Sequence, residues 1–457
     1  IPFAHRMLPL LLLSLLATAA LAAPSSKANG TVNTFAGPLK YNEDWGYTLV
    51  RSGAHTFWWL YAAEKADENR PLFMWLQGGP GSSSTGYGNF QELGPKTLED
   101  TDNEATWLQK GDLIFVDNPV GTGFSYVESN DKYTTNVAQI GNDLVNWAVD
   151  FFSVHPEYKT RPFFIVCESY GGKMTAEFAS QLKMAVNAGV IPLTKFKGVG
   201  LGDSWISAMD YVNTWGEYLY AQSYLDEQQL DRINKKADSC QSLVDAGKWS
   251  QATNCWSAME DLVSIETDGV SWYNVLKQGD QDAWSSSLKS NRIDTRTPVE
   301  KLYDRHVRPL QLDALDNYMD TVIRNKLGII PDNVHFGAQS GMVFNKQSGD
   351  FMTPNWDTVD KLLNYGLQVT VFNGQLDLIC DTIGTERWIN RLQWKGLAQY
   401  KTATKKPFST KSFPLAGYTK TYQNFEMIYI LRAGHMVAHD TEESGLYVLQ
   451  SMIDRAK

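Results

Sequence analysis

The sequence predicts an α/β fold in which a mostly parallel central sheet is flanked by helices and carries a mainly helical cap. Short, continuous apolar runs end in Gly, Pro, Asp or Asn, as is typical of strands that are buried on both faces. Helical segments lie between several of these runs, which favours parallel strands joined by helices. The predicted strands span residues 71–77, 112–117, 162–167, 196–201, 368–372 and 425–431.

The pattern changes in the middle of the chain. Residues 140–152 show the apolar spacing of a helix that packs on a sheet. Between residues 203 and 340 strand-like runs disappear, and residues 227–260 have an amphipathic helical pattern. We therefore predict a sheet domain built from residues 24–202 and 341–457, with residues 203–340 inserted as the helical cap.

Composition excludes one class of partner. The chain has 457 residues, 20% of them charged, and a formal net charge of -10. Nucleic-acid binding requires clustered Lys and Arg to neutralise phosphates, and no run of five basic residues occurs. We expect no nucleic-acid partner.

The N-terminal region predicts entry into the secretory pathway. Residues 7–22 form an apolar stretch that ends in Ala20-Leu-Ala22, a pattern typical of a cleaved signal peptide. The stretch is too short to span a bilayer comfortably, so we expect no stable membrane insertion. The protein is predicted to be secreted or lysosomal, and Asn29 in Asn29-Gly-Thr31 is a predicted N-glycosylation site.

Four cysteines allow a disulfide in an oxidising compartment. Cys240 and Cys255 would close a short loop within the helical stretch, and we favour this pair. Cys167 and Cys380 lie beside the motifs described next and are predicted to be free, buried thiols.

A sharp turn around Ser169 predicts a serine nucleophile. The segment Cys167-Glu-Ser-Tyr-Gly-Gly172 lies between a predicted strand and a predicted helix. Small residues around such a serine permit a strained turn that exposes its hydroxyl, and the next backbone N–H faces the developing oxyanion. This arrangement is typical of the α/β-hydrolase fold, in which a catalytic acid and a histidine follow the serine.

Candidates for the acid and the base lie past the last two predicted strands. His435 would take the Ser169 proton, while Asp377 would hold the imidazole tautomer and stabilise the imidazolium. Asp381 is a rival for the acid. His439 lies four residues after His435, but no Glu falls within the spacing and no third ligand is evident, so we expect neither a metal nor a cofactor.

Five sequence blocks in order resemble the serine carboxypeptidase family, over residues 40 to 450. The blocks are Trp75-Leu-Gln-Gly-Gly-Pro-Gly81, Glu92-Leu-Gly-Pro95, Asp117-Asn-Pro-Val-Gly-Thr-Gly-Phe-Ser-Tyr126, Glu168-Ser-Tyr-Gly-Gly172 and Gly434-His-Met-Val437. The resemblance implies that Asp377, and not Asp381, is the triad acid. It also implies that the backbone N–H groups of Gly79 and Tyr170 form the oxyanion hole.

The same resemblance implies a site for the terminal carboxylate of a peptide. Its members would be Trp75, Gln77, Glu92 and Glu168. Two glutamates would repel a carboxylate if all three groups were ionised, so at least one must be protonated, and burial with like charge raises a carboxyl pKa. Binding is therefore predicted to strengthen as pH falls, although His435 must then keep a depressed pKa to act as a base.

Three positions depart from the family pattern. Gln77 replaces the usual Asn, Ser82 replaces a disulfide-forming Cys, and Ala438 replaces a common Pro. We predict a serine carboxypeptidase that releases C-terminal residues from peptides with a free C-terminus, through an acyl-enzyme. The alternatives are a serine esterase or acyltransferase, or a non-catalytic secreted or lysosomal scaffold.

Overall fold

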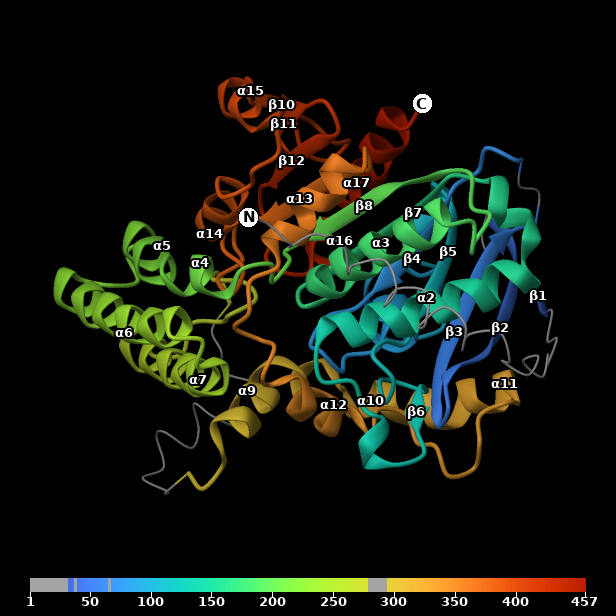
Figure 1. Cartoon of the computed structure of the whole chain (residues 1–457), viewed down its shortest axis with the longest axis horizontal. Helices are drawn as coiled ribbons and strands as arrows, with labels where there is room; N and C mark the ends of the chain where they lie inside the picture. The colour runs from blue at the N-terminus through green and yellow to red at the C-terminus, as the bar shows by residue number, and fades with distance from the viewer. Residues whose placement is uncertain (1–31, 37–38, 65–66, 278–293) are drawn as a thin grey trace, which may run out of the picture.

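A single twelve-stranded sheet organises the computed structural model, which describes residues 32–36, 39–64, 67–277 and 294–457 (Figure 1). The predicted signal peptide and Asn29 lie outside the described residues. Six neighbouring strands pair in parallel. In spatial order they are β5 (Asp112–Val116), β4 (Leu72–Leu76), β7 (Phe163–Glu168), β8 (Phe196–Gly202), β9 (Gln368–Gly374) and β12 (Phe425–Ile430). All six predicted strands are thus confirmed, with ends shifted by one or two residues.

Both ends of the sheet are antiparallel, which the sequence analysis did not predict. One end holds β1 (Val32–Ala36), β2 (Leu39–Arg51), β3 (Ala54–Ala63) and the short β6 (Tyr126–Val127), and the other holds β10 (Lys406–Phe408) and β11 (Gly417–Tyr422). In β2, buried residues such as Tyr41 and Trp45 alternate with less buried ones. Such alternation suits a strand near the edge of a sheet, and a search for continuous apolar runs misses it.

Side chains of each central strand alternate between two apolar cores. In β4, Leu72, Met74 and Leu76 belong to one buried cluster, whereas Phe73 and Trp75 belong to the other. Because successive side chains of a strand point to opposite faces, both faces of the sheet are covered. This confirms the predicted class of a parallel sheet flanked by helices.

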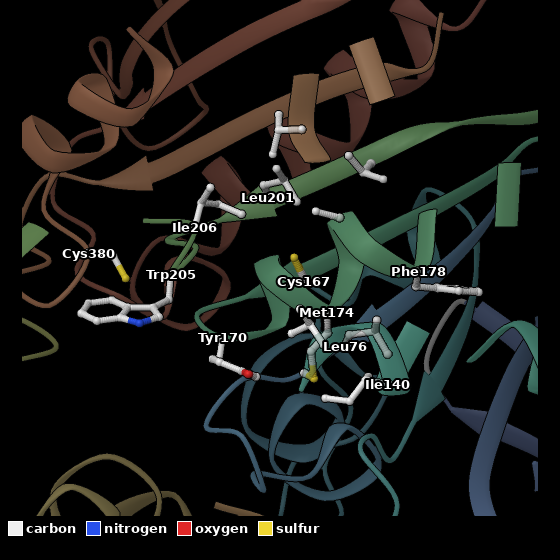
Figure 2. Packing of buried hydrophobic residues seen from close by; sticks show 14 of the residues in the cluster. Leu76, Ile140, Cys167, Tyr170, Met174, Phe178, Leu201, Trp205, Ile206 and Cys380 are labelled. Carbon is white, nitrogen blue, oxygen red and sulfur yellow. The ribbon is translucent and has the colours of Figure 1, made fainter. Parts of the chain in front are cut away.

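Helices from three parts of the chain cover the two faces. One face carries α2 (Val137–Val154), α3 (Gly171–Asn187) and α13 (Trp356–Asn364), and the other carries α16 (Val437–Asp440) and α17 (Glu442–Arg455). The predicted helix at 140–152 lies within α2, where the Asn136 side chain caps the first turn. Figure 2 shows Met174 and Phe178 of α3 in the cluster that also contains Cys167 and Leu201 of neighbouring strands.

The secondary-structure elements described between β8 and β9 are helices, and α6 and α7 project from one side of the sheet domain (Figure 1). The predicted single stretch at 227–260 is two helices, because Gly247 with φ of 67° turns the chain between them. Cys240 and Cys255 form the disulfide that joins this pair. The helices here are α4 (Ala208–Val212), α5 (Trp215–Ala221), α6 (Glu227–Asp245), α7 (Trp249–Glu266), α9 (Pro298–His306), η6 (Arg308–Leu310), α10 (Asp313–Tyr318), η7 (Met319–Ile323), α11 (Arg324–Leu327) and α12 (Ser340–Gln347).

The remaining described helices lie outside the segment between β8 and β9. They are η2 (Ser84–Leu93), η3 (Trp107–Gln109), η4 (Asn130–Lys132), η5 (Pro156–Thr160), α14 (Thr382–Ile389) and α15 (Leu397–Thr402). Within the ranges that the structure describes, none of the helices has both the length and the apolar character to cross a bilayer. Cys167 and Cys380 are free and buried, as predicted.

Candidate active site

Ser169 lies in a strained turn between β7 and α3. Its φ is 61°, which is uncommon for a residue other than glycine. Neighbouring chain segments approach so closely that only glycine fits: a Cβ on Gly78 would lie 2.4 Å from the Ser169 Cβ, and one on Gly172 would lie 2.3 Å from the Ser204 Cβ. Ser169 is itself partly exposed, so the turn presents its side chain at the carboxyl end of the sheet.

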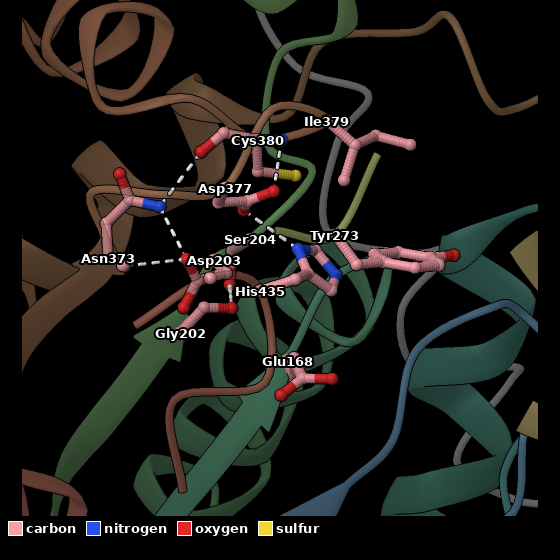
Figure 3. A network of polar contacts seen from close by, with 12 residues as sticks. Glu168, Gly202, Asp203, Ser204, Tyr273, Asn373, Asp377, Ile379, Cys380 and His435 are labelled. Atoms are coloured by element: carbon pink, nitrogen blue, oxygen red, sulfur yellow. Dashed lines mark hydrogen bonds and ion pairs between the residues drawn. The ribbon is translucent and has the colours of Figure 1, made fainter. Parts of the chain in front are cut away.

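Asp377 and His435 meet at the same end of the sheet, although 58 residues separate them. Asp377 follows β9 and His435 follows β12, and the Asp377 Oδ2 lies 2.8 Å from the His435 Nδ1 (Figure 3). Both side chains are buried. The His435 Nε2 has no hydrogen-bond partner among the described residues, which leaves it available as a base toward a hydroxyl.

Asp381, the other candidate for the acid, caps a helix. Asp381 begins α14, where its Oδ1 accepts from the Gly384 N–H at 2.9 Å and its Oδ2 accepts from the Thr214 hydroxyl at 2.6 Å. A carboxylate committed to a helix cap is not free to orient an imidazole. His439 lies in α16 and contacts the Gln91 carbonyl at 3.2 Å.

Tyr273 is a neighbour of His435 that sequence reasoning missed. Its ring centroid lies 4.9 Å from that of His435, and its carbonyl accepts the His435 backbone N–H at 2.7 Å. The preceding carbonyl, that of Trp272, accepts from the N–H groups of Leu378 and Ile379, just past Asp377. The segment thus ties the Asp377 and His435 loops together. No local motif marks it, because only the folded chain brings residue 273 to residue 435.

The proposed oxyanion donors lie on opposite sides of Ser169 in the chain but close together in space. Tyr170 precedes the first residue of α3, and Gly79 has a φ of 113° in the turn after β4. A Cβ built on Gly78 would lie 3.0 Å from the Tyr170 nitrogen, so the turn after β4 packs directly against the Ser169 turn. Two backbone N–H groups beside a nucleophile form the geometry needed to stabilise an oxyanion.

The four residues expected to bind a carboxylate lie in one buried group. The Trp75 indole N–H donates to the Gln77 Oε1 at 2.7 Å, and the Gln77 Nε2 donates to the Glu168 Oε1 at 3.0 Å. Gln77 is 1% exposed and Glu92, from η2, is 5% exposed. The longer amide of Gln77 therefore still bridges the tryptophan and the glutamate.

Burial changes the protonation of the two glutamates. Desolvation raises the pKa of Glu92 to about 8. Desolvation, followed by the like charge of Glu92, raises the pKa of Glu168 well above its usual range. Two adjacent buried carboxyls cannot both ionise at low cost, so the pair holds at least one proton at acidic and neutral pH.

One group has the residue types of a metal site. Ligand atoms of Asp377, Cys380 and His435 lie within 4.8 Å of one another. Burial raises the pKa of the Cys380 thiol well above its usual range, so the thiol stays neutral. A neutral thiol is a poor metal ligand, and the direct bond between Asp377 and His435 already uses two of the ligand atoms. The bond between Asp377 and His435 therefore fits a carboxylate that orients an imidazole better than a metal centre.

Comparison with known proteins identifies relatives along almost the whole chain. The family model for serine carboxypeptidase matches residues 34–455. Retinoid-inducible serine carboxypeptidase of Mus musculus is 46% identical over 414 residues, covering 89% of this chain and 90% of the relative, and the Homo sapiens protein is 43% identical with the same coverage. Serine carboxypeptidase-like 51 of Arabidopsis thaliana is 39% identical, covering 87% of this chain and 89% of the relative.

A solved structure supports the fold. Kex1Δp, a prohormone-processing carboxypeptidase from Saccharomyces cerevisiae, superposes with a TM-score of 0.75 at 21% identity, and 91% of each chain is covered.

Proposed function

The chain belongs to the serine carboxypeptidase family, and from this premise we propose that Ser169, His435 and Asp377 release C-terminal residues from peptides through an acyl-enzyme. The family resemblance read from the sequence is confirmed, and the protein is a serine-type hydrolase of this class. What remains a proposal is the assignment of each step to a residue.

The proposed chemistry follows from the positions of these groups. The Ser169 hydroxyl attacks the scissile carbonyl while His435 Nε2 accepts its proton, and Asp377 stabilises the imidazolium. The N–H groups of Gly79 and Tyr170 stabilise the oxyanion of the tetrahedral intermediate. His435 then protonates the leaving amine, and a water molecule deprotonated by His435 hydrolyses the acyl-enzyme, which regenerates the Ser169 hydroxyl.

The carboxylate group supports cleavage at a C-terminus. Glu168 immediately precedes the nucleophile, and its hydrogen bond to Gln77 joins it to Trp75. A protonated Glu92 or Glu168 donates a hydrogen bond to the terminal carboxylate of a peptide. This contiguity of the glutamate pair with Ser169 is the observation that carries the exopeptidase assignment.

The pH dependence follows from the raised pKa of Glu92. Below about 8 its carboxyl is protonated and can donate, and above that value it becomes an anion that repels the substrate carboxylate. Affinity for a free C-terminus should therefore fall as pH rises through this value. An acidic preference suits the proposed location, which rests on the signal-like residues 7–22 and is secreted or lysosomal.

We further propose that residues 203–340 act as a cap on the site. Two observations support this assignment: the Tyr273 ring contacts the His435 ring, and the secondary-structure elements described in the insertion are helices. The exact limits of the cap, and those of the two parts of the sheet domain, are proposed from the sequence pattern.

Labelling with a fluorophosphonate tests the nucleophile. The wild-type protein should be labelled and Ser169→Ala should not, whereas Ser239→Ala on the exposed surface of α6 should behave as wild type. An unlabelled wild-type protein would contradict the proposal. Specificity is then tested with N-blocked dipeptides that carry either a free C-terminal acid or an amide, at pH 4.5 to 7. Equal cleavage of the two would refute the carboxylate site.

A further inference from the structure

A second buried carboxyl pair lies behind the catalytic histidine. Asp203 is the first residue after β8, between β7 and β9, and it is 1% exposed. Its backbone N–H donates to the Phe372 carbonyl at 2.9 Å, and its φ of 38° is unusual for a residue other than glycine. The fold therefore fixes this carboxyl at the end of the sheet, in the network drawn in Figure 3.

The two oxygens of Asp203 have different surroundings. Oδ1 accepts from the Asn373 Nδ2 at 2.6 Å and from the Gly374 N–H at 2.8 Å. Oδ2 is buried and has no hydrogen-bond donor among the residues that the structure describes. A buried carboxylate oxygen without a donor is costly, and a proton on that oxygen converts it into a donor.

Asp377 is the acceptor within reach of that proton. Asp203 and Asp377 follow the neighbouring strands β8 and β9. The Asn373 Nδ2, which donates to the Asp203 Oδ1, also donates to the Cys380 carbonyl at 2.9 Å and so joins Asp203 to the Asp377 loop (Figure 3). Asp377 is 0% exposed, and burial followed by the charge of Asp377 raises the pKa of Asp203. Asp377 Oδ2 accepts from His435 Nδ1 at 2.8 Å, and among the described residues its Oδ1 accepts one long bond, 3.3 Å, from the Cys380 N–H. Asp377 must remain an anion to stabilise the imidazolium, so Asp203 is the member of the pair that carries the proton.

We propose that Asp203 is a positioning residue, a neutral carboxylic acid whose Oδ2–H donates to Asp377 and thereby limits the basicity of the Asp377–His435 pair. The inference rests on the proposed roles of those two residues. Burial and the charge of Asp377 raise the pKa of Asp203 well above its usual range, which agrees with the neutral form.

Within the part of the chain that the structure describes, the groups around the pair offer no other positive charge. The titratable side chains that face the pair are Glu168 from β7, Cys380 and Asp381 from the loop after β9, Tyr218 from α5, Tyr273 and His435. Of these, only His435 can become positive. A second anion beside it would stabilise the imidazolium further and weaken its action as a base at acidic pH, whereas a neutral Asp203 adds no charge next to Asp377.

Two substitutions separate the proton from the shape of the side chain. In Asp203→Asn, the amide oxygen can accept from Asn373 and Gly374 while the amide N–H donates to Asp377, so kcat and its acid limb should stay close to wild type. In Asp203→Ala the donor is lost, and the acid limb of kcat should move up by about one pH unit, which lowers kcat at pH 5 about tenfold. KM for a free-acid dipeptide should be unchanged in both, because the glutamate pair is untouched.

Proton NMR provides a readout that does not need turnover. The His435 Nδ1–H resonance, assigned by its loss in His435→Ala, should keep its position in Asp203→Asn and move downfield in Asp203→Ala, where Asp377 is a stronger acceptor. A failure of the proposed peptidase function would abolish turnover in the wild type but leave this spectral comparison intact.

The opposite results would overturn the inference. They are an acid limb and resonance in Asp203→Ala that match wild type, or a shift in Asp203→Asn as large as that in Asp203→Ala. If Asp203→Ala does not fold, the decision rests on Asp203→Asn alone: an unchanged acid limb and resonance support the inference, and a shifted limb or a loss of kcat contradicts it.

Discussion

The structure contains two pairs of buried carboxyls, Glu92 with Glu168 and Asp203 with Asp377, and the two pairs differ in the hydrogen-bond partners of their oxygens. In the pair of Glu92 and Glu168, Gln77 donates to one oxygen and the group is proposed to receive a substrate carboxylate. In the pair of Asp203 and Asp377, hydrogen bonds from the protein hold both residues. The oxygen without a partner among the described residues is the Asp203 Oδ2, which we propose donates to Asp377. Burial, followed by the like charge of the neighbouring carboxyl, raises the pKa of Glu168 and of Asp203 well above its usual range, which favours a shared proton in each pair. A buried carboxyl pair is therefore proposed to bind substrate in one place and to position the histidine in the other.

The largest effect on kcat is expected at Asp377, the member of the second pair that bonds to His435. Asp377→Asn keeps the shape but favours the wrong imidazole tautomer, so kcat should fall by about 10⁴-fold with little change in KM. Steady-state kinetics on a free-acid dipeptide measures this. Asp381→Asn is the matched control, because its carboxylate caps α14, and it should retain most of kcat. A larger loss of kcat in the control than in Asp377→Asn would reverse the assignment.

The first pair should instead affect binding. Glu92→Ala removes a donor to the substrate carboxylate, and kcat/KM for a free-acid dipeptide at pH 5 should fall about 10- to 100-fold, chiefly through KM. The corresponding C-terminal amide should lose far less. Glu92→Gln keeps a donor that does not titrate, so its kcat/KM should no longer decline as pH rises through about 8. An unchanged decline in this variant would assign the titration to another group.

A smaller effect is expected at the amide that supports the first pair. Gln77→Asn shortens the side chain that bridges Trp75 and Glu168, so one of these two hydrogen bonds should weaken. Loss of one neutral hydrogen bond predicts about a 2- to 10-fold change in KM for the free acid. Competition by a non-cleavable free-acid peptide measures the affinity directly, and an equal change for the amide would show that the bridge acts on something other than the carboxylate.

The smallest expected effect is on the pH dependence of thermal stability, which should change in the same direction for variants in either carboxyl pair. A carboxyl whose folded pKa lies above its unfolded value retains its proton in the folded state, so unfolding releases protons and stability declines as pH rises. For Glu92 this pH window runs from the usual glutamate pKa of 4.5 to the raised pKa of about 8. Glu92→Gln and Asp203→Asn should each make Tm decline less steeply as pH rises. At this chain length, each kcal/mol of unfolding free energy that no longer depends on pH corresponds to a change in Tm of about 1 °C. Parallel Tm curves for wild type and both variants would be inconsistent with retained protons.

Local sequence patterns determined much of this molecule. The run from Phe163 to Glu168, followed by small residues and a helix, identified the turn at Ser169 because a buried strand and a sharp turn are encoded within a few residues. The antiparallel strand β2, which lies next to the edge strand β1, was missed, since its alternating pattern is partly exposed and carries a weaker signal. The break at Gly247 was missed because amphipathic periodicity continues on both sides of it.

The sequence by itself determined the central strands, the turn at Ser169 and the position of Glu168 beside the proposed nucleophile, because each depends on residues adjacent in the chain. Only the tertiary structure decided that Tyr273 lies on His435 and that Asp203 meets Asp377. Those contacts arise where the ends of β8, β9 and β12 converge at one edge of the sheet, and burial there, which no local pattern encodes, sets which carboxyl keeps its proton.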